Sequence, residues 1–324
     1  MLTKPLLKSS WVRWPVYAAV AAFAVYKLVP VLQASDSLNG FDISDALVPK
    51  SKIEHGGPPR DGIPALTRPP MRAVTKADYL KPTDRVLALS LNGDSRAYPI
   101  RILNWHEVVN DTVGGRGVVI SYCPLCGTGM VFDAQVNGQT LDFGVSGLLY
   151  NSDMLLYDRQ TSSLWSQIKA QAISGPLKGS KLSLIAADYT SWQDWQKQHP
   201  DGLVMDKNTG HARDYSRDPY AGYENVATLY FDVQNRDQRF HEKEPVVGLI
   251  IDGKAKVWPL SELEKVRKWP LQDSLGATSL RISYRAQDKS VTIVDAKGIR
   301  LPAVPAYWFA WVAFYPDTQV FLFE

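Results

Sequence analysis

Two stretches of the 324-residue chain match each other without a gap and decide the fold. The first is Val86-Leu-Ala-Leu-Ser-Leu-Asn-Gly-Asp-Ser-Arg-Ala-Tyr-Pro-Ile100, and the second is Val246-Val-Gly-Leu-Ile-Ile-Asp-Gly-Lys-Ala-Lys-Val-Trp-Pro-Leu260. Each has an apolar run, an Asn-Gly or Asp-Gly pair, and a second run that ends in an aromatic residue and proline. Asn-Gly and Asp-Gly favour the two-residue turn of a β-hairpin, because both positions need a positive φ. The sequence therefore predicts the same hairpin twice.

The similarity between the two halves continues beyond the hairpins. Ile120-Ser-Tyr122 matches Ile282-Ser-Tyr284, and Val131-Phe-Asp-Ala134 matches Ile293-Val-Asp-Ala296. Self-similarity at a constant offset indicates two copies of one supersecondary unit. The 15 tyrosines and 10 tryptophans suit pleated sheet surfaces. We predict a mainly β fold, with α+β as the alternative, built from a duplicated unit.

The repeats and the composition between them predict five segments. They are a membrane anchor or signal segment (1–34), a tether (35–72), the first repeat (73–165), an insertion (166–242) and a second, degenerate repeat (243–324). Within the insertion, Tyr189–His199 is typical of a short helix that Thr190 or Ser191 caps and Pro200 ends. Residues 209–225 are rich in Gly, Asp, Arg and Tyr and predict a long surface loop.

The N-terminus has the pattern of a membrane-spanning segment. Lys4, Lys8 and Arg13 precede an apolar stretch, Trp14–Leu32, that is long enough to cross a bilayer as a helix. Positive charge before such a span keeps the N-terminus in the cytoplasm. We therefore predict a single-pass signal-anchor in the cytoplasmic membrane, with a cleaved signal ending near Ala34 as the alternative. Both place the body outside the cytoplasm, in the periplasm or the extracellular space.

The charge distribution argues against nucleic-acid binding. The net charge is +3, and the basic residues of the N-terminal segment account for it, which leaves a nearly neutral body without a basic run. A nucleic-acid-binding protein would normally carry a basic face. The membrane is the one partner that the sequence indicates, and it identifies no protein or small-molecule partner.

The two copies differ where chemistry is expected. Cys123-Pro-Leu-Cys126 in the first copy aligns with Arg285-Ala-Gln-Asp288 in the second, and Asn151-Ser-Asp153 aligns with Phe309-Ala-Trp311. Thiols and polar side chains in the first copy thus stand where the second copy has apolar or ordinary charged residues. We interpret the first copy as functional and the second as structural.

Metal binding is the leading interpretation of the Cys-x-x-Cys pair. A tight turn aims both sulfurs at one point, and Gly127 permits the backbone to approach closely. The chain has no other cysteine, so further ligands must be of another type; His106 and Glu107, in Asn104-Trp-His-Glu107, are the candidates. Thiolates together with imidazole suit copper, zinc or iron.

Two other interpretations of the pair remain open. The first is a thiol-disulfide oxidoreductase of exported proteins, with Cys123 and Cys126 as the reactive thiols and Asp153 as a general base or a further ligand. The second is a binding or assembly module in which the pair forms a structural disulfide, which an oxidising compartment would permit. The sequence thus leaves open whether the protein is an enzyme.

Several motifs together resemble a known family. They are Asn104-Trp-His-Glu107, Asn110-Asp-Thr-Val-Gly114, Tyr122-Cys-Pro-Leu-Cys-Gly127, and Gly147-Leu-Leu-Tyr-Asn-Ser-Asp153 with Tyr157-Asp-Arg159 and Ser163-Leu-Trp165. In these the chain resembles the bacterial and archaeal domain-of-unknown-function family 3179, and the similarity covers most of the body. The resemblance implies a domain assignment and adds no mechanism.

Overall fold

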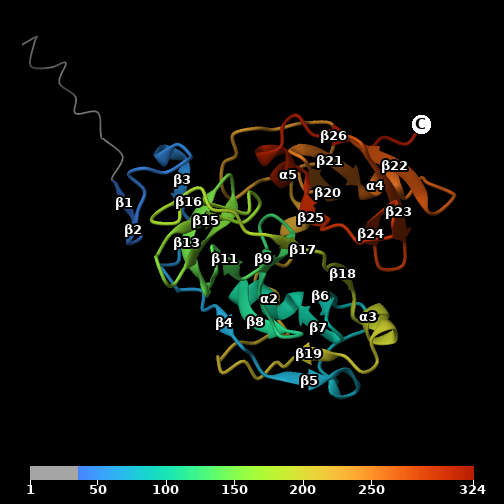
Figure 1. Ribbon diagram of the computed structural model, residues 1–324, viewed down its shortest axis with the longest axis horizontal. Coiled ribbons are helices and arrows are strands. Elements are labelled where there is room, and N and C mark those ends of the chain that lie inside the picture. Colours follow the sequence, from blue (N-terminus) through green and yellow to red (C-terminus); the bar gives the residue numbers. More distant parts are fainter. Residues whose placement is uncertain (1–35) are drawn as a thin grey trace, which may run out of the picture. The chain divides into compact units, whose positions relative to one another are not determined.

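The computed structural model describes residues 36–324, so the predicted membrane segment Trp14–Leu32 lies outside the described residues. Within the described part, no helix combines the length and the apolar character needed to cross a bilayer. The described chain is mainly β, as predicted. Five sheets of three to five strands lie in a β-propeller-like arrangement, and the helices are short (Figure 1).

The first predicted hairpin is present. Strands β6 (Arg85–Leu91) and β7 (Asp94–Pro99) pair antiparallel. The turn between them consists of Asn92 and Gly93, whose φ angles of 50° and 84° explain the Asn-Gly sequence. Three more strands complete this sheet, in the order β18-β6-β7-β19-β5. They are β18 (Asp188–Ser191), β19 (Leu203–Met205) and β5 (Met71–Ala73).

The second predicted hairpin has the same turn and the same neighbours. Strands β20 (Pro245–Ile251) and β21 (Lys254–Pro259) are joined by Asp252 and Gly253, with φ angles of 50° and 76°. Strand β25 (Val304–Tyr307) pairs antiparallel with β20, as β18 does with β6. Strand β26 (Gln319–Val320) pairs parallel with β21, as β19 does with β7. The copies therefore share a strand order.

This correspondence corrects part of the sequence alignment. Helix α3 (Trp192–Gln198) follows β18, and helix α5 (Trp308–Phe314) follows β25. The segment 309–311 is therefore the counterpart of α3, and its predicted alignment with residues 151–153 was wrong. Residues 188–205 belong to the first repeat, although the sequence comparison assigned them to the insertion. The error arose because the first copy carries extra residues after β10, which change the offset between the copies.

A second hairpin in each copy contains the Cys-x-x-Cys turn or its counterpart. In the first copy, β9 (Arg116–Cys123) and β10 (Thr128–Asp133) lie in the sheet β17-β10-β9-β8-β4. Its other strands are β4 (Leu66–Thr67), β8 (Val108–Val113) and β17 (Leu184–Ile185). The second copy has the sheet β22 (Leu271–Leu275), β23 (Thr278–Arg285) and β24 (Ser290–Asp295). The Cys-x-x-Cys turn joins β9 to β10, and Arg285-Ala-Gln-Asp288 begins the corresponding turn.

Another sheet, which we call the inserted sheet because its strands β13 to β16 lie between β10 and β18 in the chain, is almost wholly buried and has no counterpart in the second copy. Its order is β16-β15-β14-β13-β3. Its strands are β3 (Ile53–His55), β13 (Phe143–Tyr150), β14 (Asp153–Asp158), β15 (Leu164–Ser166) and β16 (Gln171–Ser174). One core cluster joins this sheet to α5 and to both cysteines, so the inserted sheet and the second repeat share a core around the thiols.

The remaining elements are short. They are β1 (Ser37–Leu38), β2 (Phe41–Asp42), β11 (Gln135–Val136), β12 (Gln139–Thr140), α2 (Ile100–His106), α4 (Leu260–Leu263), and the 3-10 helices η1 (Lys50–Lys52), η2 (Val74–Lys76) and η3 (Tyr223–Asn225). The predicted helix in Tyr189–His199 is confirmed as α3, and Ser191 caps it by accepting a hydrogen bond from the Asp194 N–H. Between β19 and β20, residues 206–244 form only η3, which confirms the predicted long loop; we call this stretch the covering segment.

In the second copy, the turn that corresponds to Cys-x-x-Cys contacts the first copy. The buried Asp288 carboxylate accepts hydrogen bonds from Thr190 Oγ1 (2.5 Å) and the Ser191 N–H (3.4 Å), and pairs with Arg285 (3.0 Å). We expect Asp288→Ala to lower the free energy of unfolding by about 2–3 kcal/mol, because buried donors lose their acceptor. The exposed Asp317→Ala should change it by less than about 0.5 kcal/mol. Equal losses in urea unfolding of the two variants would show that Asp288 does not link the copies.

Candidate metal centre

The Cys-x-x-Cys pair lies in a tight turn between two strands, as predicted. Strand β9 ends at Cys123 and β10 begins at Thr128. The Cys126 N–H donates to the Cys123 carbonyl (3.2 Å), and Gly127 has a φ of 60°. A side chain at Gly127 would meet the Tyr307 ring at 3.0 Å. The thiols therefore lack the helix N-terminus that lowers the pKa of a reactive cysteine.

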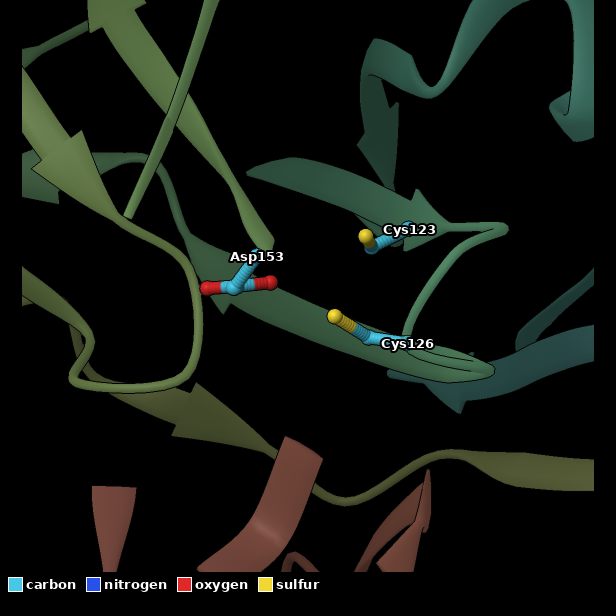
Figure 2. A group of neighbouring side chains, drawn as sticks. All are labelled: Cys123, Cys126 and Asp153. Atoms are coloured by element: carbon cyan, nitrogen blue, oxygen red, sulfur yellow. The ribbon is translucent and has the colours of Figure 1, made fainter. Parts of the chain in front are cut away.

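A second tight turn brings Asp153 to the thiols. Asn151 and Ser152, with φ angles of 53° and 63°, join β13 to β14, and Asp153 pairs with Tyr150 as the first residue of β14. The Cys123 and Cys126 sulfurs and an Asp153 carboxylate oxygen all lie within 4.8 Å of one another. Figure 2 shows the three side chains directed toward one another. Among residues 36–324, this is the one group of three such ligands.

The three side chains are buried, and the two thiols form no disulfide with each other. Cys123 is 1% exposed, and Cys126 and Asp153 are 0% exposed. The sulfurs are 3.5 Å apart, without a disulfide. Burial raises the pKa of the Cys126 thiol well above its usual value, and the neighbouring Cys123 and Asp153 add to the increase. Burial also raises the pKa of Asp153 to about 8, against hydrogen bonds that lower it.

Several buried oxygen atoms in the Asp153 turn, and in the segment that leads to Ile168, have no hydrogen-bond partner within residues 36–324. One oxygen of Asp153, Oδ2, accepts from the Ile168 N–H (3.1 Å), whereas Oδ1 has no partner within the described residues. The same holds for Ser152 Oγ, Ser166 Oγ and Gln167 Oε1, from the same turn and from the end of the neighbouring strand β15. A buried oxygen without a donor is costly, and a bound cation removes that cost. The residues present therefore fit a metal ion.

The covering segment and the second repeat close the site. The Tyr307 N–H of β25 donates to the Cys126 carbonyl (2.7 Å). Tyr223 of the covering segment is 3% exposed; its hydroxyl has no partner within residues 36–324. Tyr223 belongs to the same buried core cluster as both cysteines, and burial raises its pKa, with a further increase from the charges of Cys126 and Cys123. Solvent thus reaches neither sulfur directly.

A cavity of about 670 Å³ borders the same turn. Tyr122 and Gly127, which flank the two cysteines in sequence, line it together with Tyr189, Lys243 and Tyr307. A cavity of this volume accepts a small organic molecule.

His106, predicted as a ligand, does not join the metal group. Its Nδ1 contacts the Pro64 carbonyl (2.7 Å) and its Nε2 contacts the Tyr215 hydroxyl (2.7 Å), so both ring nitrogens are occupied. Glu107, the other predicted ligand, is also buried and outside the group, and burial raises its pKa to about 8. Proximity in sequence suggested both residues, whereas the geometry favours Asp153 as the third ligand.

The Asn-Trp-His motif instead holds the covering segment. Asn104 Nδ2 donates to Asp218 Oδ1 (2.9 Å), Trp105 Nε1 donates to the Arg217 carbonyl (3.1 Å), and His106 contacts Tyr215. These three contacts come from consecutive residues at the end of α2. They fix the part of the covering segment that precedes Tyr223.

The His106 contacts predict a pH dependence of stability. Burial lowers the pKa of His106 from 6.5 to about 4, and the charges of His211 and Arg213 act in the same direction. The folded protein therefore binds this proton less well than the unfolded chain, and stability is lost as the pH falls below about 6.5. Between pH 7.5 and pH 5, we expect the wild type to lose about 1–2 kcal/mol more than His106→Gln, after allowance for solvent screening. Parallel stability curves for the two proteins in urea would contradict this.

Comparison with known proteins identifies a family whose description names no reaction. The family model described as "Protein of unknown function (DUF3179)" matches residues 60–318. No curated protein matches the chain. No solved structure matches it either.

Proposed function

Because the chain belongs to the DUF3179 family, whose description names no reaction, we propose its function from its own site: Cys123, Cys126 and Asp153 bind one transition-metal ion. The observation that carries this proposal is the convergence of two thiols and a carboxylate in a buried space where Asp153 Oδ1 has no other partner. Thiolate and carboxylate are ligands of zinc, iron and copper. Three protein ligands leave a further coordination position for water, a substrate or another side chain.

The chemistry of the ligands supports a site that exchanges protons for metal. Burial raises the pKa of Cys126 and of Asp153, so the metal-free site holds protons at neutral pH. A metal ion requires thiolate and carboxylate, so its binding releases those protons and its affinity rises with pH. The bound ion can act as a Lewis acid or fix the fold, and with copper or iron it can also transfer electrons.

A thiol-disulfide oxidoreductase is the second candidate. The sulfur separation of 3.5 Å supports it, because a small movement would bring the sulfurs to the bond length of about 2.05 Å. Two features speak against it: burial favours the thiol form of Cys126, and no helix N-terminus stabilises a thiolate. The third interpretation is a binding or assembly module with a structural disulfide. The structure does not support it, because Cys123 and Cys126 form no disulfide.

We also propose that the body lies outside the cytoplasm on a single membrane anchor. Support comes from Lys4, Lys8 and Arg13 before the apolar stretch Trp14–Leu32. A metal would protect two reduced cysteines in an oxidising compartment, so the two proposals agree.

Elemental analysis of the full chain tests the metal proposal. The protein is purified in detergent without a metal-affinity step, and thiols are counted before and after unfolding in a chelator. About one metal per chain, with two thiols appearing only after unfolding and chelation, is the expected result. No metal, together with thiols that appear only after reduction, would overturn it in favour of the oxidoreductase or the disulfide.

A further inference from the structure

A second cavity, of about 710 Å³, lies at the beginning of the covering segment. Its wall consists of the stretch 207–216 together with Tyr79 and Arg101. None of the three proposed metal ligands lines it. Its volume is within the range of small-molecule sites.

Three positively charged side chains line this cavity. Arg101 comes from α2, and Lys207 and Arg213 come from the covering segment. Asp214 is the one acid in the lining, and its carboxylate accepts hydrogen bonds from the Ser216 N–H (3.0 Å) and Ser216 Oγ (2.6 Å). In a body that is nearly neutral overall, this concentration of positive charge is local.

The two arginines are held in place by neighbouring groups. Arg101 donates through Nη1 to the Tyr79 carbonyl (3.0 Å) and lies 3.3 Å from Asp84, whereas its buried Nε has no partner within residues 36–324. The Arg213 guanidinium lies over the Trp105 ring, 5.8 Å from its centroid. An arginine held by a carbonyl or an aromatic ring loses less entropy when it binds an anion.

We propose that this cavity binds a small polyanion, a phosphate ester or a polycarboxylate, through Arg101, Lys207 and Arg213. Both ligand types present several oxygens that match the fork of a guanidinium. The site is separate from the metal centre and does not depend on the proposed function.

Calorimetric titration of the full chain in detergent, at constant ionic strength, tests the proposal. The two probes are inorganic phosphate and citrate. The probe that binds more tightly shows whether the cavity prefers phosphate or carboxylate oxygens. We expect saturable binding of at least one of them, weakened about tenfold or more in Arg213→Gln and in Arg101→Gln. Lys268→Gln removes the same charge from an exposed position elsewhere and should leave the affinity within about twofold.

Arg213→Gln decides the test if Arg101→Gln fails to fold, because Arg213 lies in an exposed loop and makes no salt bridge in the described chain. The proposal is overturned if the wild type binds neither probe. It is also overturned if Arg213→Gln and Lys268→Gln bind the better probe equally well, because binding would then reflect charge anywhere on the surface.

Discussion

Cys123→Ser is expected to reduce the metal content of the full chain from about one ion to below about 0.1 per chain. Serine is nearly isosteric but does not ionise at neutral pH, so one of two thiolate ligands is lost from a site with three. Asp153→Asn should have the same effect, because the amide cannot supply the anionic oxygen. Elemental analysis and competition with a chromophoric chelator measure both variants, and we expect affinity to fall at least about 100-fold.

Asp158→Asn is the matched control for these variants. Asp158 lies at the other end of β14, is also fully buried, and accepts hydrogen bonds from Trp165 Nε1 (2.9 Å) and from Thr161 Oγ1 (2.8 Å). Its replacement should lower stability by about 1–3 kcal/mol and leave the metal content unchanged. Full metal content in Cys123→Ser, or equal loss in Asp158→Asn and Asp153→Asn, would contradict the assigned ligands.

Gly147→Ala is expected to destabilise the fold by more than about 3 kcal/mol. Gly147 has a φ of 74° in β13, and a Cβ there would lie 2.7 Å from Asn39 Nδ2 and still closer to the Pro58 carbonyl oxygen. The Pro58 backbone and the inserted sheet would have to separate to make room. Because β13 leads into the turn before Asp153, the same change should also lower the metal content.

Gly138→Ala separates the two contributions to that loss. Gly138 has a φ of 80°, and a Cβ there would meet no atom within 4 Å. Its replacement should cost about 1 kcal/mol, which is the backbone strain alone. Urea unfolding of both variants gives the comparison; a similar loss in each would mean that the contacts around Gly147 adjust without cost.

Turn chemistry made the hairpins predictable from sequence. Asn92-Gly93 and Asp252-Gly253 adopt the positive φ angles that their residue types favour, and this preference is local. The cap of α3 was predictable for the same reason, because Ser191 and Asp194 are three residues apart. Features set by neighbours in sequence were thus within reach.

The extent of the repeat was missed because it depends on residues far apart in sequence. Trp192 and Trp195 in α3 correspond to Trp308 and Trp311 in α5, and Pro200 corresponds to Pro316. This Trp-x-x-Trp and proline signal was present in the sequence. The inserted sheet interrupts the first copy, so a comparison at constant offset passed over it.

The site was predicted in part. The Cys-x-x-Cys turn followed from spacing, and Asp153 was among the candidates, although the alignment that drew attention to it was wrong. Sequence could not show that Tyr215 and the Pro64 carbonyl occupy both nitrogens of His106. Nor could it place Tyr223 in the same buried core as the thiols, because the covering segment has almost no regular structure from which to project a position.

The contact between the Tyr307 N–H and the Cys126 carbonyl has a consequence for the order of events during synthesis. A growing chain presents both thiols and Asp153 long before the ribosome has made β25 and α5, which complete the core around them. Residues 154–303 separate Asp153 from β25, so at about 5–20 residues per second the covering elements are made roughly 8–30 seconds after the ligands. If the site binds a metal as proposed, an ion that enters in this interval meets ligands that the C-terminal elements do not yet cover. We expect an ion that arrives later to bind more slowly, because β25 and α5 then complete the core around the thiols.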